Sequence, residues 1–506
     1  MPRFPRRGLL QIIASSGLLA CLALAAGAAR APQAAHLKIG ARAGRKIPAH
    51  FTGFSIEVFS AAHRYIGPAG NLNLGFLRLM RNLGQGTLRI GGNSSDESCW
   101  QPRRAPRPRG CHYDITRAAV RGWAQASART GWGVIVGLNL AQNAPAWMET
   151  YARAVAAIMR STPRSRWLGF EIGNEPDIFS RHRLYDHVNA RSRNYSLADY
   201  EKDYRAYASA LRSNPATAQV PLYGPAFCCG WLAHGLAGFL GRVGHKNLNV
   251  VTVHSYEMTH CGGHHPTIRQ LLSPRRLAAM GTRFSQEAQA AHAAGFPIQM
   301  GETNSISCQG ENGVTNAFAE TVWGLHWLFL NARAGMRALN FHEGGNYRGR
   351  GYFYDAVLVH LRHKTRGVSR RARVYRNQVW PLYYAMYAFA RHAQGRALLS
   401  ARFAAGAGLT AYAVRGRHAT TVFLLPGRRA PAAHVVIPAP ASHPARILYI
   451  RAASLASRQV TYGGARFTSA GRLTHAPRWH AVRANYGQYR FTLPAAAVGI
   501  FTVPNK

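Results

Sequence analysis

Hydrophobic positions follow two patterns along most of the chain, short β-rich runs and longer stretches with helical spacing. Eight of the short runs are typical of buried strands, at residues 51–57, 86–91, 132–140, 167–173, 221–227, 250–257, 297–302 and 338–343. Helix-competent stretches include 115–130, 144–161, 197–213, 274–294, 314–334 and 379–392. This alternation predicts an α/β fold, a (β/α)8 TIM barrel over residues 47–395, rather than an open sheet.

The pattern changes after about Ser400, where short alternating runs follow one another without a long helix. These runs lie at 409–414, 420–425, 434–437, 446–450, 459–462 and 489–493 and predict a smaller antiparallel β-sandwich over residues 396–506. Residues 30–46 precede the barrel and are expected to add a strand to this sandwich. The Arg-rich stretch 347–376 is too long for a simple connection, so we expect a functional loop there.

The composition is that of a globular protein with an unusual charge. Of the 506 residues, 47% are hydrophobic, which excludes wholesale disorder. Lys and Arg number 63 against 19 Asp and Glu, a net charge of +44, and no acidic residue follows Asp355. Such a surface suits a polyanion, but a GC-rich genome that encodes Arg in place of Lys, or life in acid, would produce it too, and these alternatives stay open.

Residues 1–29 are typical of an export signal. Arg3, Arg6 and Arg7 precede an apolar run that ends in small residues before Arg30. The pair Arg6-Arg7 resembles a twin-arginine signal, which predicts a bacterial protein exported to the periplasm or the extracellular space. Contact with a membrane is expected only if this segment is retained as an anchor.

Export permits disulfides, and six cysteines follow the signal. Cys99 and Cys111 bracket a short Pro/Arg-rich loop and are the candidates for a bridge, while the pairing of four others stays open, namely Cys228, Cys229, Cys261 and Cys308. The cysteine and histidine spacings are not those of a zinc site, so neither a metal nor a cofactor is expected.

Two glutamates stand where barrel chemistry takes place. Glu175 follows the fourth predicted strand and Glu302 closes the seventh, and the active sites of TIM barrels lie at these strand ends. Two facing carboxylates are the usual equipment for glycoside hydrolysis, one protonated as the acid and one ionised as the nucleophile. A single strand-end glutamate is equally compatible with a helix cap, but the pair at two strand ends favours catalysis.

Several motifs give the chain a family resemblance. It resembles the retaining glycosidases of glycoside hydrolase family 79, which contains β-glucuronidases and heparanases, through Leu88-Arg89-Ile90-Gly91-Gly92-Asn93, Asn174-Glu175-Pro176, His254-Ser255-Tyr256, Gly301-Glu302-Thr303-Asn304-Ser305 and Gly345-Asn346-Tyr347. The resemblance implies retention, with Glu175 as acid/base and Glu302 as nucleophile. It also implies that the sugar carboxylate is held by backbone N–H groups at Gln309 and Gly310 and by Tyr347.

Further residues are expected to contact the same sugar. Asn174, beside the acid, is placed to hydrogen-bond the 2-hydroxyl group, and Tyr256 could donate to Glu302. Three more side chains at strand ends are expected to line the site, namely Glu57, Asn93 and His342. Glu343 is interpreted as a supporting residue because the nucleophile of this clan falls on the seventh strand.

The leading hypothesis is an exported enzyme that releases β-linked glucuronic acid from glycans or glycosides with retention. The alternatives are a heparanase-like endo-β-glucuronidase acting on acidic polysaccharide, a related glycosidase for another sugar, and a non-catalytic polyanion-binding protein. The expected partner is a carbohydrate that contains glucuronic acid, and no nucleic acid. The sequence leaves open exo or endo action, the aglycone, the pH optimum and the oligomeric state.

Overall fold

A computed structural model of the chain describes residues 34–102, 110–142, 144–184, 189–344, 351–363, 373–429, 431–439 and 444–505. The expected export segment and Tyr347 lie outside these residues. Among the described residues, no helix is both long enough and apolar enough to cross a membrane.

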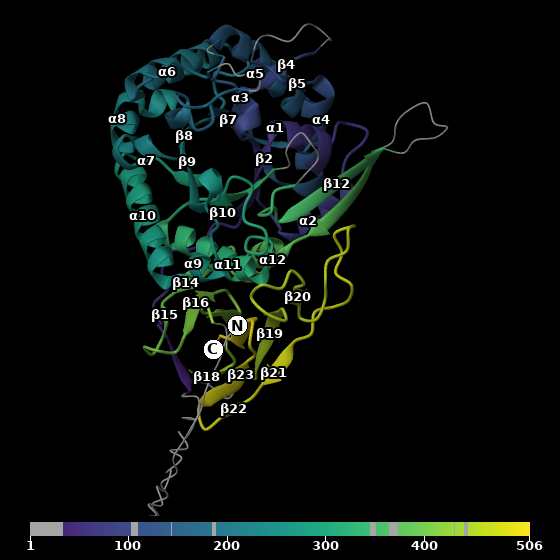
Figure 1. Cartoon of the computed structure of the whole chain (residues 1–506), viewed down its shortest axis with the longest axis vertical. Helices are drawn as coiled ribbons and strands as arrows, with labels where there is room; N and C mark the ends of the chain where they lie inside the picture. The colour runs from purple at the N-terminus through teal and green to yellow at the C-terminus, as the bar shows by residue number, and fades with distance from the viewer. Residues whose placement is uncertain are drawn as a thin grey trace, which may run out of the picture. The chain divides into compact units, whose positions relative to one another are not determined.

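Eight parallel strands close into a barrel, which confirms the predicted fold (Figure 1). Around the barrel they are β2 (Thr52–Glu57), β3 (Thr87–Gly91), β6 (Gly133–Leu138), β7 (Arg166–Ile172), β8 (Leu222–Phe227), β9 (Val250–Thr259), β10 (Ile298–Ser307) and β11 (Leu339–Glu343). Each of these strands overlaps one of the eight runs predicted from the sequence. β2, β3, β6 and β8 are buried along their whole length, as strands covered on both faces must be.

Helices cover the outside of the barrel. They are α2 (Leu74–Asn82), α4 (Arg117–Thr130), α5 (Pro145–Ser161), α6 (Leu197–Ser213), α8 (Leu236–Asn247), α10 (Pro274–Ala293), α11 (Phe318–Ala334) and α12 (Pro381–His392). α6 begins with a capping box, in which Ser196 and Asp199 exchange side-chain and backbone hydrogen bonds. α11 is buried on nearly all sides because it also meets the second domain.

The strand that carries Glu302 differs from the prediction in length. β10 continues to Ser307 beside an equally long β9, and the two run together beyond the last predicted strand residues. Their register shifts between Met300 and Glu302, which is the signature of a bulge at Gly301. Bulges re-aim the side chains next to them, so this irregularity sets the direction of Glu302.

The stretch expected as a functional loop contains regular structure. β12 (Val357–His363) and β13 (Arg373–Val379) pair antiparallel over seven residues. Exposed positions alternate with less exposed ones along β13, but Val374 is exposed and Asn377 is buried, so the sequence shows no regular alternation of polar and apolar residues there.

Two sheets make up the C-terminal region. One has the order β14-β16-β17-β24-β19-β20, with β21 beside β19, and the other has the order β15-β1-β18-β23-β22. Their strands are β1 (Ala35–Ile39), β14 (Ala397–Leu399), β15 (Ala401–Phe403), β16 (Leu409–Arg415), β17 (Ala419–Pro426), β18 (Ala433–Pro438), β19 (Ala445–Arg451), β20 (Thr461–Tyr462), β21 (His480–Val482), β22 (Ala484–Asn485), β23 (Gln488–Leu493) and β24 (Ala497–Pro504).

One of these strands departs from a simple antiparallel pattern, and another was not predicted from the sequence. β1 pairs antiparallel with β15 but parallel with β18. β24 was not among the predicted strands, although it lies between β17 and β19. It is buried almost throughout, and a continuous apolar run of this kind does not show the alternation expected of a half-exposed strand.

Side chains of α11 join the barrel to the sandwich. The ring of Phe329 stacks on Tyr412 of β16 with 4.4 Å between centroids, and it meets Phe389 and Phe423 edge-on. Backbone hydrogen bonds add to this contact, because the N–H groups of Phe318 and Ala319 donate to carbonyls of residues 457 and 455.

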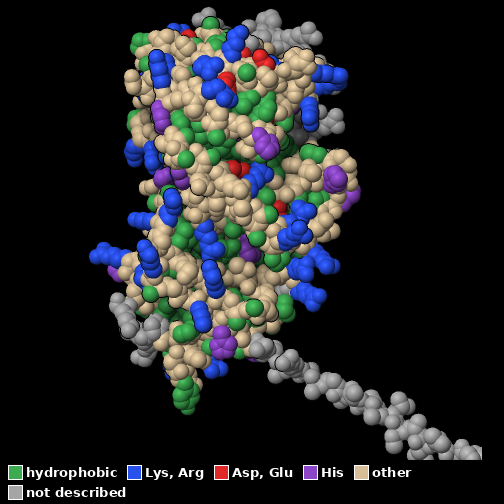
Figure 2. Space-filling view, turned by 90° about the vertical axis from the view of Figure 1, so that its left-hand side faces the viewer, with side chains coloured by type: hydrophobic (Ala, Val, Ile, Leu, Met, Phe, Trp, Pro, Cys, Tyr) green, Lys and Arg blue, Asp and Glu red, His purple; other side chains and the backbone are tan. Residues whose placement is uncertain are grey.

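Positive side chains dominate the surface. On the face shown in Figure 2, Lys and Arg are spread widely and few Asp or Glu are visible. All of the strands from β14 to β24 lie after Asp355, the last acidic residue. Their arginines therefore cannot find a carboxylate within the sandwich.

The structure pairs all six cysteines that follow the expected signal. Cys99 bonds to Cys111, the pair proposed from the sequence. Cys228 bonds to its neighbour Cys229, and Cys261 bonds to Cys308 across the ends of β9 and β10.

Truncating the side chain at the centre of the domain contact should destabilise the protein. We expect Phe329→Ala to lower the free energy of unfolding by about 3–5 kcal/mol, because it leaves a cavity among three aromatic rings. Urea unfolding followed by tryptophan fluorescence measures this change, with the exposed Leu74→Ala as the control. A loss below about 1 kcal/mol, as for an ordinary surface substitution, would contradict the packing described.

Candidate active site

The loop after β7 presents Glu175 under backbone strain. Glu175 has a φ of 49°, a left-handed value that costs energy in a residue with a Cβ. Hydrogen bonds hold it there, since its N–H donates to the carbonyl of Ala226 at 3.2 Å and its own carbonyl accepts from Ile178 at 3.0 Å. Such strain is typical of functional loops.

A buried arginine joins the strands beneath this loop. The Arg89 guanidinium donates to Glu171 and to Glu302 Oε2, the latter at 2.6 Å. It also donates to Ser55 Oγ at 2.9 Å and to Asn174 Oδ1 at 2.8 Å. Burial disfavours the charged guanidinium, but Glu171 and Glu302 outweigh this and raise the pKa of Arg89 above its usual value. Arg89 is therefore a permanent cation at the floor of the site.

Glu302 lies among donors and cations. Besides Arg89, Tyr256 donates its hydroxyl to Glu302 Oε1 at 2.9 Å, and His342 Nδ1 lies 3.2 Å from Oε2. Burial alone would raise the pKa of Glu302, but His342, His254 and Arg89 together hold it well below its usual value. Glu302 is thus ionised across the physiological range.

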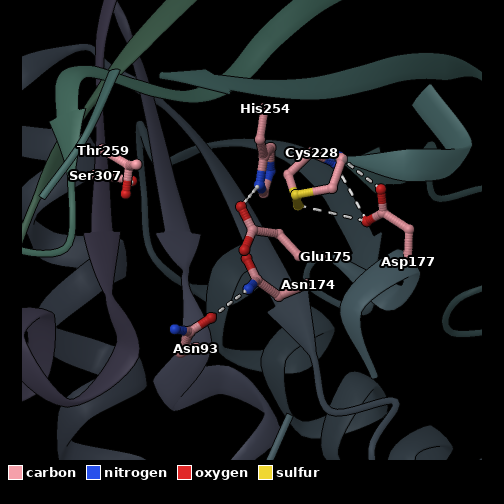
Figure 3. Close-up of a disulfide and its surroundings, with 9 residues drawn as sticks. Asn93, Asn174, Glu175, Asp177, Cys228, His254, Thr259 and Ser307 are labelled. Atoms are coloured by element: carbon pink, nitrogen blue, oxygen red, sulfur yellow. Dashed lines mark hydrogen bonds and ion pairs between the residues drawn. A yellow bond between two sulfur atoms is a disulfide. The ribbon is translucent and has the colours of Figure 1, made fainter. Parts of the chain in front are cut away.

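Glu175 has the opposite electrostatics. Burial, with the nearby negative charge of Glu302, raises the pKa of Glu175 to about 8, although Arg89 and His342 oppose the shift. The Glu175 side chain points toward His254, whose Nδ1 lies 3.0 Å from Oε1 (Figure 3). Burial and Arg89 lower the pKa of His254 to about 4, so this imidazole is neutral. Glu175 therefore keeps its proton at neutral pH.

His342 connects Glu302 to Glu57. Its Nε2 lies 3.4 Å from Glu57 Oε1, on the other side of the ring from Glu302. Burial opposes its charge, but the two carboxylates raise the pKa of His342 to about 10. Glu57 also accepts from the Ser94 N–H at 2.8 Å. A Cβ on residue 92 would lie 2.6 Å from the Glu57 carboxylate, so only glycine fits at that position.

Asn174 is buried and tied on two sides. Its Oδ1 accepts from Arg89, and its Nδ2 donates to Asn93 Oδ1 at 3.0 Å (Figure 3). Asn93 itself is exposed and lines the cavity. Glu343, in contrast, accepts the N–H groups of Ala356 and Val357 and so anchors the segment that follows β11.

These residues surround one cavity of about 630 Å³. A carboxylate oxygen of Glu175, Nδ1 or Nε2 of His254 and a carboxylate oxygen of Glu302 all lie within 4.8 Å of one another. Among the predicted residues, the lining includes Glu57, Asn93, Glu175, Tyr256, Glu302, Gln309 and His342. Strand ends far apart in the sequence thus deliver both carboxylates to one space.

The turn after β10 closes one side of the cavity. Cys308, Gln309 and Gly310 have consecutive φ values of 59°, 74° and 79°. A Cβ at Gly310 would lie 2.6 Å from Thr315 Oγ1, so a glycine is required. The Gln309 carbonyl accepts from Phe353 at 2.7 Å, which brings the segment after β11 against this turn.

Sequence reasoning missed several residues of the site. Arg89 and His254 belong to the motifs named above, but the sequence analysis gave them no role. The position of a charged residue inside a buried strand could have indicated a function for Arg89. Tyr352 and Tyr354 line the cavity, as do both residues of the Cys228–Cys229 pair. Nothing local distinguishes these four, because their place depends on how loops from β8 and β11 fold back.

Three groups of the described residues could hold a cation by distance alone, namely Glu175/His254/Glu302, Asp177/Cys228/Cys229 and His260/His265/Glu311. The second group has no thiolate, since its sulfurs form a disulfide. In the third group, Nδ1 of His260 and of His265 lie 2.6 Å and 3.2 Å from Glu311 Oε2, so hydrogen bonds to this carboxylate account for the cluster without a metal.

Comparison with known proteins relates the chain to glucuronidases. No family model matches it. A β-glucuronidase of Aspergillus niger is 22% identical over 342 residues, 59% of this chain and 59% of that protein. A β-glucuronidase of Neurospora crassa is 23% identical over 341 residues, 59% of this chain and 58% of that protein. The match thus spans about three fifths of the length of these relatives.

Solved structures share the fold. A 4-O-α-L-rhamnosyl-β-D-glucuronidase of Fusarium oxysporum 12S has a TM-score of 0.70 at 15% identity, covering 92% of this chain and 100% of that one. A GH51 arabinofuranosidase from Xanthomonas axonopodis pv. citri has a TM-score of 0.65 at 12% identity, covering 93% and 100%. The chain thus shares its fold with these two solved enzymes, and the two sequence relatives are β-glucuronidases.

Removing the buried cation should destabilise the barrel. We expect Arg89→Met to lower the free energy of unfolding by about 3–5 kcal/mol, because Glu171 and Glu302 then remain buried without their partner. Urea denaturation measures the change. Arg89→Met/Glu171→Gln should lose less than Arg89→Met, since one uncompensated carboxylate is gone. Equal losses in the two variants would contradict the proposed charge balance.

Proposed function

We propose that the protein is an exported retaining glycoside hydrolase that releases β-linked glucuronic acid. The observation that carries this proposal is the pair of facing glutamates with opposite protonation, Glu175 neutral and Glu302 ionised, whose oxygens lie within 4.8 Å. Retaining enzymes place their carboxyl groups about 5–5.5 Å apart, whereas inverting enzymes leave room for a water. An oxygen-to-oxygen distance of at most 4.8 Å is closer to the retaining spacing than to the inverting one, which supports retention.

The reaction begins with both groups acting together. Glu302 attacks the anomeric carbon while Glu175 gives its proton to the glycosidic oxygen, so the C–O bond breaks and an alcohol leaves. A covalent glycosyl ester on Glu302 results. Glu175, now ionised, takes a proton from water, and the hydroxide formed attacks the same carbon and frees Glu302.

Neighbouring residues support each role. Tyr256, Arg89 and His342 hold Glu302 ionised and oriented for attack. Asn174 uses its Oδ1 and one N–H within the protein, which leaves the second N–H for the 2-hydroxyl group of the sugar. That contact strengthens as the transition state forms.

Recognition of a uronic acid is the more specific part of the proposal. The turn at Gln309 and Gly310 offers backbone N–H groups beside the nucleophile strand, and consecutive N–H groups in a turn can bind an anion. Tyr352 and Tyr354 line the same cavity. The relationship to β-glucuronidases of two fungi supports the assignment.

The cavity and the disulfides support the remaining parts. A volume of about 630 Å³ suits one sugar and part of its leaving group rather than a long polysaccharide, which favours exo action. Three disulfides are typical of an oxidising compartment and so favour export.

Paired chromogenic substrates test the function. We expect 4-nitrophenyl β-glucuronide to be cleaved with kcat/KM at least about 100-fold above that of the β-glucoside, because only the glucuronide fills the carboxylate site. Glu302→Gln should lose at least about 1,000-fold on the glucuronide, since the nucleophile is gone. Glu149→Gln, on α5 and outside the cavity, should keep full activity.

Two results would contradict parts of the proposal. Cleavage of both substrates at equal rates would contradict the proposed binding site for the sugar carboxylate. Release of the α anomer as the first product, observed by proton NMR, would contradict the retaining mechanism.

The pH dependence of kcat/KM should follow the two glutamates. Activity falls as pH rises through about 8, because the raised pKa of Glu175 marks the loss of its proton. On the acid side activity persists well below pH 4.5, since the pKa of Glu302 is depressed. Glu175→Gln, assayed with the activated aryl glucuronide, should lose the alkaline limb. An alkaline limb that survives in this variant would show that another group carries it.

A further inference from the structure

The Cys228–Cys229 disulfide lies at the mouth of the catalytic cavity. The two cysteines follow β8 directly, and both line the cavity together with Glu175 and Glu302. Cys229 is exposed and Cys228 is half-buried, so the disulfide presents its surface to the open space. No role in the proposed chemistry uses it.

Hydrogen bonds join the segment after β8, which holds the disulfide, to the loop that carries Glu175. Asp177 accepts the N–H of Cys229 at 2.6 Å and that of Cys228 at 3.3 Å, and its side chain points toward the disulfide (Figure 3). Two residues earlier, the Glu175 N–H donates to Ala226 at 3.2 Å. The disulfide is therefore held in a constant position relative to the proton donor.

Different segments contribute side chains of different polarity to the lining of the cavity. The ends of β2, β3 and β11 contribute polar groups, namely Glu57, Asn93 and His342. The segments after β7 and β8 contribute Glu175 and, beside it, the apolar Ile178, Cys228 and Cys229. A disulfide is polarisable and has no N–H or O–H group to donate, so it favours contact with an apolar surface.

The chemistry of the acid decides what meets this apolar part. Glu175 protonates the oxygen that joins the sugar to its leaving group, so the leaving group lies beside the acid/base loop. The cleaved sugar, rich in hydroxyls, occupies the polar part. The apolar side chains beside Glu175 thus face the leaving group.

We propose that Cys228–Cys229, with Ile178, forms the binding site for the leaving group and selects one that presents the flat face of a ring. This inference rests on the proposed glucuronidase function. The ring is either aromatic or the C–H face of a pyranose, because both bring a flat apolar surface to the sulfurs.

Matched substrates test the inference on the full chain. They are 4-nitrophenyl β-glucuronide, a disaccharide of glucuronic acid β-linked to a neutral hexose, and methyl β-glucuronide, which carries no ring beyond the cleaved bond. We expect Cys228→Ala/Cys229→Ala to lower kcat/KM about five- to tenfold for at least one ring-bearing substrate and less than twofold for the methyl glycoside. The inhibition constant of free glucuronate, which fills the sugar site alone, should change less than twofold.

Two further variants separate contact from folding. Ile178→Ser keeps the disulfide and should reduce the same ring-bearing substrate selectively. Cys99→Ala/Cys111→Ala removes a disulfide outside the cavity and should leave the ratio between substrates unchanged.

The outcomes distinguish the two proposals. Equal losses on ring-bearing and methyl glucuronides in both cavity variants, or no loss on any, would overturn the leaving-group site while the glucuronidase function stands. Failure of the unaltered protein to cleave any of the three would overturn the proposed function, and the leaving-group site with it.

Discussion

The site depends on one buried cation. The Arg89 guanidinium donates hydrogen bonds to Ser55 on β2, Glu171 on β7 and Glu302 on β10. It also donates to Asn174, at the start of the loop that carries Glu175. A charge without water around it is tolerated only when partners surround it. Those partners cannot move independently, because each shares the same planar group. The arginine therefore sets the spacing of the strand ends and, together with His342 and His254, holds Glu302 ionised.

The different surroundings of the two glutamates explain why their pKa values shift in opposite directions within one cavity. Glu302 contacts Arg89 directly and has His342 beside it, so its charge is compensated. Glu175 contacts a neutral His254 instead and lies near a carboxylate that is already ionised. Like charges at this distance disfavour a second ionisation. The opposite protonation of the two glutamates thus follows from which of them lies beside His342 and Arg89.

The structure also gives the cavity two parts of different chemistry. Polar groups come from strand ends near Glu302, and the segments after β7 and β8 place the apolar Ile178, Cys228 and Cys229 beside Glu175. Asp177 links the second set to the acid/base loop through the N–H groups of Cys228 and Cys229. Because one carboxylate receives both donors, the apolar surface and the proton donor keep a constant relation, which is what a site for a leaving group requires.

The sequence by itself determined the barrel, because each buried strand leaves a local apolar run, and it located Glu175 and Glu302 at strand ends. It missed β24, whose continuous apolar run lacks alternation, and the β12–β13 hairpin. Only the tertiary structure decided the contacts of Arg89, the opposite pKa shifts of the glutamates and the bonding of Cys228 to Cys229. The first two arise from contacts between segments far apart in the chain, and such contacts leave no local pattern. The disulfide joins neighbouring residues, but the sequence left its pairing open because four cysteines allow more than one set of bonds.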